Sequence, residues 1–178
     1  MSNRGPFGLW MGMTESDFDD PLEELSQCKF KACSVPESHS AFDLFIVQIT
    51  PKNGLSWIKA VGKTVDSSAY GIELKSTFES MESKLASTYG KHKKHDFLMA
   101  DSIWNEPRDW MQGIVSRERV LMAVWSRKDG SSLSNSLVSV GLFANVCDTS
   151  SGYIAIEYTF ENGAKADVEI ASLEDCAL

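Results

Sequence analysis

The sequence lacks any apolar run that approaches the roughly 20 consecutive residues needed to cross a bilayer. It also lacks the marks of a secretory signal, because Arg4 is followed by neither an apolar h-region nor a small-residue cleavage site. The apolar stretch 7–13 is short and is interrupted by two glycines. We therefore expect a cytoplasmic protein that does not associate with a membrane.

The cysteines lack the spacing that metal or redox sites require. The four cysteines, Cys28, Cys33, Cys147 and Cys176, form no C-x-x-C pair and no motif with histidine. This pattern is typical of reduced thiols in an ordinary globular protein. We expect no metal and no cofactor.

Recognisable catalytic motifs are missing as well. The sequence contains no P-loop, no G-x-G-x-x-G and no G-x-S-x-G. His92 and His95 with Asp96 form the only cluster of histidine and carboxylate, and the lysines interspersed with them oppose a bound dication. We therefore predict no catalytic residue, and an enzyme would have to lack a known motif.

Basic residues are in the minority. The chain has 17 Lys and Arg against 25 Asp and Glu, a net charge of −8 and a pI near 4.9. Residues 1–90 and 91–178 each carry −4. Non-specific nucleic-acid binding needs a basic face, so nucleic acid is not expected as a partner, and a basic protein is the better candidate.

The residues that are present predict an α+β fold in one domain, 1–178. We expect a mainly antiparallel sheet packed by one long amphipathic helix and two or three short helices. An alternative organisation is a pair of tandem helix-plus-sheet halves, 7–62 and 66–170. Predicted strands are 7–13, 29–35, 44–50, 55–61, 96–100, 120–125, 138–146, 153–160 and 165–170, and predicted helices are 15–19, 21–27, 68–89 and 107–116.

Two local patterns are the clearest. The runs 44–50 and 55–61 flank Pro51-Lys52-Asn53-Gly54, which predicts a β-hairpin. In the helix 68–89, apolar residues recur at steps of three and four, which draws one stripe for a core, and Gly90 is suited to end it. The stripe residues are Leu74, Phe78, Met81, Leu85 and Tyr89.

The opening Phe7-Gly8-Leu9, followed by Gly12-Met13-Thr14, resembles a strand-to-helix signature at the start of many small bacterial α+β proteins. These include outer-membrane-assembly lipoproteins of the BamE type. The resemblance covers about ten residues and the chain has no lipobox cysteine, so it implies bacterial or phage origin and no particular activity. Thr14 is expected to cap a helix, with Asp17 three residues later.

Two segments are candidate binding sites. The turn-rich stretch 101–111 combines Trp104, Arg108, Trp110 and Met111, residue types that are enriched at binding hot spots. The alternative is that its tryptophans cover the core. The acidic segment, residues 15–24, has six carboxylates, among them Asp17, Asp19, Asp20 and Glu23, and no base. It is either a solvated helix face or a negative patch that attracts a basic partner.

Three functional hypotheses follow. The first is a non-catalytic binding protein, such as an immunity or antitoxin-like inhibitor of another protein. The second is an accessory or regulatory protein of a phage or mobile element, and the third is an enzyme without a recognisable motif. The sequence makes no prediction about oligomeric state.

Overall fold

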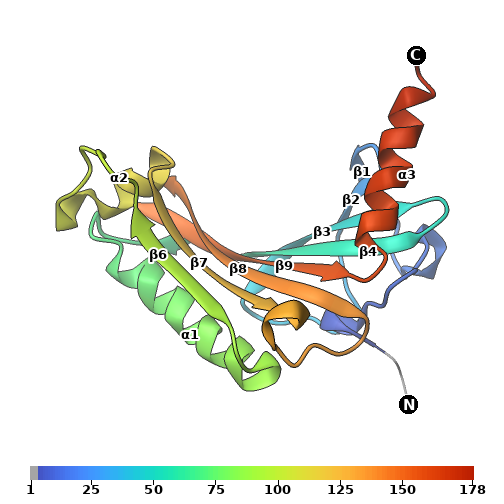
Figure 1. Cartoon of the computed structure of the whole chain (residues 1–178), viewed down its shortest axis with the longest axis horizontal. Coiled ribbons are helices and arrows are strands. Elements are labelled where there is room, and N and C mark those ends of the chain that lie inside the picture. Colours follow the sequence, from blue (N-terminus) through green and yellow to red (C-terminus); the bar gives the residue numbers. More distant parts are fainter. Residues whose placement is uncertain (1–3) are drawn as a thin grey trace. The chain divides into compact units, whose positions relative to one another are not determined.

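The computed structural model describes residues 4–178 and shows a mixed α+β protein with an open, mainly antiparallel sheet of nine strands (Figure 1). The sheet order is β1-β2-β3-β4-β9-β8-β7-β6, and β5 pairs with β9. The strands are β1 (Glu23–Ser26), β2 (Lys29–Ala32), β3 (Phe42–Thr50), β4 (Gly54–Gly62), β5 (Val65–Asp66), β6 (Lys93–Leu98), β7 (Arg119–Ser126), β8 (Leu137–Asp148) and β9 (Ser151–Phe160). The helices are α1 (Ile72–Tyr89), α2 (Trp110–Val115) and α3 (Gly163–Asp175). The predicted α+β class with an antiparallel sheet is confirmed.

The chain divides into two compact units. Unit 1 comprises the chain up to Val61 together with Leu133–Val140 and Glu157–Leu178, and unit 2 comprises Gly62–Ser132 and Gly141–Ile156. Strands β8 and β9 therefore contribute residues to both units. The single domain 1–178 and the alternative of tandem halves 7–62 and 66–170 both stay predictions.

Unit 1 is built on successive antiparallel strands. β1 pairs with β2 and β2 with β3, with Lys31 opposite Ile46 and Ala32 opposite Phe45. The turn between β3 and β4 ends at Gly54, whose φ of 66° suits glycine and whose Cα faces the backbone of Gly12. An added Cβ at Gly54 would lie 2.4 Å from the Gly12 carbonyl oxygen, so this close approach requires glycine.

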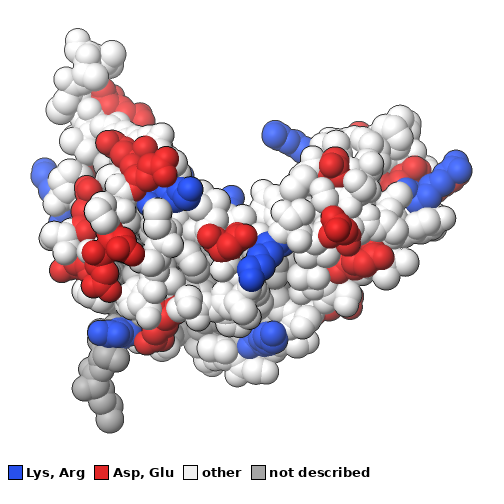
Figure 2. Space-filling model, turned by 180° about the vertical axis from the view of Figure 1, so that it is seen from behind, with Lys and Arg blue, Asp and Glu red and all other residues white. Residues whose placement is uncertain are grey.

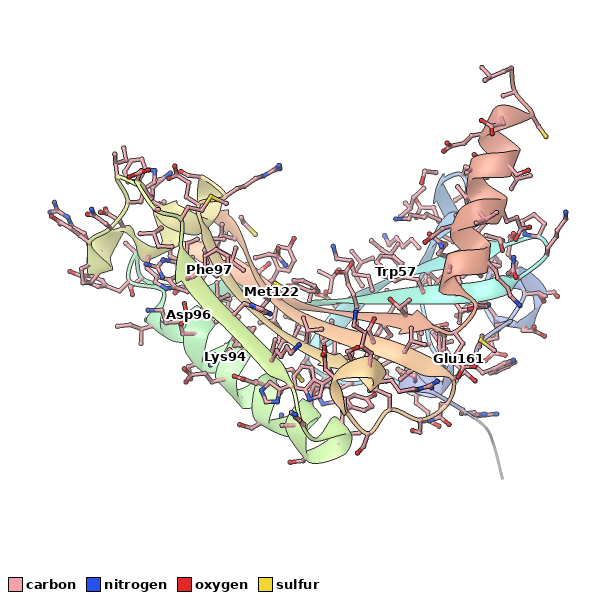
Figure 3. All side chains as sticks on the ribbon, in the orientation of Figure 1. Trp57, Lys94, Asp96, Phe97, Met122 and Glu161 are labelled. Atoms are coloured by element: carbon pink, nitrogen blue, oxygen red, sulfur yellow. The ribbon has the colours of Figure 1, made fainter. Side chains whose placement is uncertain are left out.

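Unit 2 places α1 against one face of its strands. The buried residues of α1 are Leu74, Phe78, Met81, Leu85 and Tyr89. The register of β6 with β7 places His95 beside Met122 and Phe97 beside Val120. These four side chains lie on the face of the two strands that points away from α1. Figure 3 labels Phe97 and Met122 on that face, and Lys94 and Asp96 on the other. None of the helices within residues 4–178 is long and apolar enough to cross a membrane.

Most predicted elements are present with shifted ends. The hairpin of β3 and β4, the strands β7, β8 and β9, and the helical segment at 107–115 are confirmed. α1 begins at Ile72 instead of 68, behind Gly71 at a φ of 69°, and Gly90 ends it as predicted. The strand predicted at 96–100 is β6, which begins and ends earlier.

The strand predicted at 7–13 is wrong. Pro6–Gly8 forms a 3₁₀ turn in which Phe7 has a φ of 57° and Gly8 a φ of 75°. The Phe7 ring packs edge-on against Phe42, Phe45 and Tyr158, with centroids 5.7, 4.8 and 5.9 Å away. Leu9 and Met13 are fully buried, whereas Trp10 is 36% exposed. Tertiary contacts therefore bury part of this segment without making it a strand.

Three further local predictions are corrected. The helix predicted at 21–27 is strand β1, because its residues pair with β2. The helix predicted at 15–19 is a single 3₁₀ turn, Glu15–Asp17. The strand predicted at 165–170 lies inside α3, which buries Ala166 and Glu169 and is rich in good helix formers.

Candidate functional site

The segment before β1 is anchored by backbone hydrogen bonds to β4. The N–H of Gly12 donates to the Leu55 carbonyl at 2.9 Å, and the N–H of Leu55 donates to the Met13 carbonyl at 2.8 Å. The N–H of Thr14 then donates to Asp17 Oδ2 at 2.8 Å, which is the predicted capping contact. These bonds position the segment 14–16, which lines the same pocket as Ile49 and Thr50 at the end of β3.

The hairpin of β1 and β2 forms the second wall. Its register places Glu24 opposite Phe30, so these two side chains share a face. Cys28 occupies the turn with a φ of 62°, and its carbonyl accepts the N–H of Ile49 at 2.9 Å. A left-handed conformation is uncommon for cysteine, and this bond to β3 stabilises it.

Helix α3 forms the third wall, and Glu169 attaches it to the turn after β3. Glu169 is 8% exposed, and its carboxylate accepts the Lys52 N–H and the Asn53 side-chain amide, both at 2.7 Å. Burial alone would raise the pKa of Glu169, but hydrogen bonds from Thr50, Asn53 and Lys52 outweigh it and lower the pKa. The charged carboxylate of Glu169 therefore stabilises the packing of α3 against the turn after β3.

These walls line a cavity of about 630 Å³ that is open to solvent, which we call the acidic cavity. Its inner surface is largely apolar, and its two ionisable carboxylates, Glu15 and Glu24, are exposed. Among residues 4–178, no lysine, arginine or histidine lines it. The lining residues are Thr14, Glu15, Ser16, Glu24, Gln27, Cys28, Phe30, Ile49, Thr50, Pro51 and Leu173.

The pKa of the Cys28 thiol responds to the negative charge around the acidic cavity. Burial raises the pKa of its thiol, and the negative charges of Glu169, Glu24 and Glu15 raise it further. A raised pKa disfavours the thiolate, which is the reactive form of cysteine. The arrangement therefore suits binding of a positive group and does not activate Cys28 as a nucleophile.

The charge of the protein is concentrated in unit 1. This unit holds 14 Asp and Glu against 6 Lys and Arg, a net of −8, whereas unit 2 holds 11 of each and is neutral. Figure 2 shows acidic atoms gathered on the part of the surface that carries α3 and the N-terminal strands. The unit that contains the acidic cavity thus carries the whole net charge.

The predicted acidic binding residues lie in the sequence between Glu15 and Glu24, which line the cavity, and all of them are exposed. Asp17 is held by Thr14, and Asp20 accepts a hydrogen bond from the Ser34 hydroxyl. Glu23 lies 3.9 Å from Lys31 Nζ, the one ion pair of the acidic segment among the described residues. Asp19 is exposed. Most of the negative charge of the segment therefore faces solvent.

The other predicted segment, 101–111, lies in unit 2 and is split between core and surface. Trp110 and Met111 are 4% and 0% exposed, and Lys75 Nζ lies 4.6 Å from the Trp110 ring. The side chains of Trp110 and Met111 are therefore in the core, as the alternative hypothesis for this segment predicts. Trp104 is half-buried and Arg108 is exposed, pairing with Glu106 at 2.8 Å.

The histidines near the end of α1 have separate environments. His92 stacks on Trp125 at 4.6 Å and lies 2.8 Å from Glu82, whereas His95 is exposed on the opposite face of β6. Within residues 4–178, no three His, Cys, Asp or Glu side chains are grouped to hold a metal ion.

A second hollow in unit 1 was also missed by sequence reasoning. Trp57, labelled in Figure 3, and Lys29 line a polar cavity of about 340 Å³ beside α3, with Lys29 Nζ 4.8 Å from the Trp57 ring. The buried Gln48 and Ser56 bond to each other at its base, at 3.1 Å. An alternating strand pattern does not reveal which of its outward residues share a hollow.

Comparison with known proteins identifies no relative. No family model, no curated protein and no solved structure matches the chain significantly.

Proposed function

We propose that the protein is a non-catalytic binding protein that neutralises a basic partner protein, as an immunity or antitoxin-like inhibitor does, and that it binds this partner through unit 1. The observation that supports the proposal is the concentration of the whole net charge in one unit. A surface with charge of one sign steers an oppositely charged partner and raises the association rate. Unit 1 also offers a cavity into which a partner side chain can insert.

The proposal requires that a partner depends on the acidic segment and not simply on total charge. The test variant carries Asp17→Asn, Asp19→Asn and Asp20→Asn, which preserve size and capping ability. The matched control removes three charges from exposed residues of unit 2 through Asp66→Asn, Glu79→Gln and Asp101→Asn.

Each protein is immobilised and exposed to lysate at low salt, and captured proteins are identified by mass spectrometry. We expect a basic protein that wild type and the unit 2 control retain and the acidic-segment variant loses. Equal capture by all three proteins, or equal loss in both triple variants, would contradict the proposed function.

A further inference from the structure

The acidic cavity combines two properties that suit one kind of group. Its floor is apolar, with Cys28, Phe30 and Ile49 only 8%, 8% and 6% exposed. Its rim carries the exposed carboxylates of Glu15 and Glu24. An apolar ligand would make no use of these carboxylates, and an acidic ligand would be repelled by them.

We propose that the acidic cavity receives the side chain of a lysine or arginine, whose methylene groups contact the floor and whose cationic end lies beside Glu15 and Glu24. These residues have long apolar stems and a charged end, which matches the floor and the rim. A volume of about 630 Å³ is large enough for such a side chain with part of its backbone. This inference rests on the proposed function, in which the side chain belongs to the basic partner.

A metal ion suits the cavity less well than an organic cation. Calcium takes six to eight oxygen ligands, and the cavity offers two carboxylates above a largely apolar lining. Support for a cation comes from the Cys28 thiol, whose pKa is raised first by burial and then by Glu169, Glu24 and Glu15. The fields of three carboxylates thus converge on the floor.

Cys28 allows the preference to be measured without a partner. In one variant Cys33, Cys147 and Cys176 are replaced by Ser, and in a reference variant Cys33 is the one retained cysteine. Each is treated with a trimethylammonium-ethyl or a sulfonatoethyl methanethiosulfonate. The thiolate attacks the sulfenyl sulfur, a disulfide forms and methanesulfinate leaves. We expect the ratio of cationic to anionic rate to be about tenfold higher at Cys28 than at Cys33.

The controls separate the cavity from the overall charge of unit 1. Glu15→Gln with Glu24→Gln should lower the ratio at Cys28 towards that at Cys33. Glu37→Gln with Asp43→Asn removes two exposed carboxylates of the same unit and should leave most of the ratio. Millimolar butylguanidinium should slow the reaction of Cys28, and the neutral isostere butylurea should not.

The inference is overturned if the ratio at Cys28 is no higher than at Cys33, if both carboxylate pairs act equally, or if Cys28 stays unreactive while Cys33 reacts. The last result would mean that the floor is closed to a cation. If capture depends on the acidic segment but the cavity shows no preference, this inference alone fails. If the cavity prefers cations but no partner depends on the acidic segment, the proposed function fails.

Discussion

Gly71 illustrates how one residue permits the packing of another. It precedes α1 with a φ of 69°, and an added Cβ would lie 2.0 Å from Trp110 Cε3. Gly130 has a φ of 92°, but its nearest neighbour would be 3.9 Å from a Cβ. We expect Gly71→Ala to lower the free energy of unfolding by at least about 1 kcal/mol more than Gly130→Ala, because overpacking adds to backbone strain. Urea denaturation of both variants measures this difference, and equal losses would contradict the close packing.

The lowered pKa of Glu82 leads us to expect a pH dependence of stability. Burial would raise its pKa, but hydrogen bonds from His92 at 2.8 Å and Lys94 at 3.0 Å outweigh it, so the pKa is lowered from 4.5. A lowered folded-state pKa stabilises the protein above pH 4.5, and this contribution is lost as pH falls through the folded-state value. We expect Glu82→Gln to lower the free energy of unfolding at pH 7 by about 1–3 kcal/mol.

The difference between wild type and Glu82→Gln should shrink in urea titrations below pH 4.5, where the unfolded carboxyl is protonated. The exposed Glu79 on the same helix provides the control, and Glu79→Gln should have little effect at any pH. A difference that is independent of pH would show that the charge of Glu82 is not what stabilises α1.

At the scale of elements, the Glu169 side chain attaches α3 to the turn after β3, and Asn162, just before α3, donates to the Asn53 carbonyl of the same turn at 2.9 Å. Glu169 accepts the N–H of Lys52 and the amide of Asn53, which lie 117 and 116 residues away. We expect Glu169→Ala to raise the hydrogen-exchange rate of the Lys52 amide by about tenfold or more, because that N–H loses its acceptor. Glu174→Ala, an exposed change on the same helix, is the control and should leave the rate unchanged. An unchanged rate in both variants would show that the Glu169 carboxylate does not protect the Lys52 amide.

At the scale of the whole molecule, the separation of charge predicts how a partner associates. With a captured partner, replacing Asp17, Asp19 and Asp20 by Asn should slow association and flatten its salt dependence, because salt screens these same charges. Trp104→Ala should instead raise the dissociation rate if the exposed part of 101–111 is in contact with the partner. Surface-based kinetics at two salt concentrations measure both effects. If the triple variant associates at the wild-type rate at low salt, the acidic segment is only a solvated surface.

Local features could be predicted because their causes lie within a few residues. The turn at 51–54 determines the hairpin of β3 and β4, Thr14 and Asp17 form a capping pair, and Gly90 ends α1. The spacing of apolar residues in α1 identifies the five side chains that are buried. In each case the backbone geometry brings together residues that are already close in sequence.

The tertiary structure alone decided the identity of β1 and α3, the distribution of charge and the acidic cavity. The segment 21–27 has a weak local preference, so pairing with β2 determines that it is a strand. In 165–170 the alternation of apolar residues suggests a strand, but the surrounding helix formers and the bonds of Glu169 to a distant turn favour α3. The two sequence halves each carry −4, and the net of −8 in unit 1 arises because β9 and α3 return to the N-terminal strands. Composition and spacing can be read directly from the sequence. A site, in contrast, depends on which distant segments the folded chain brings together.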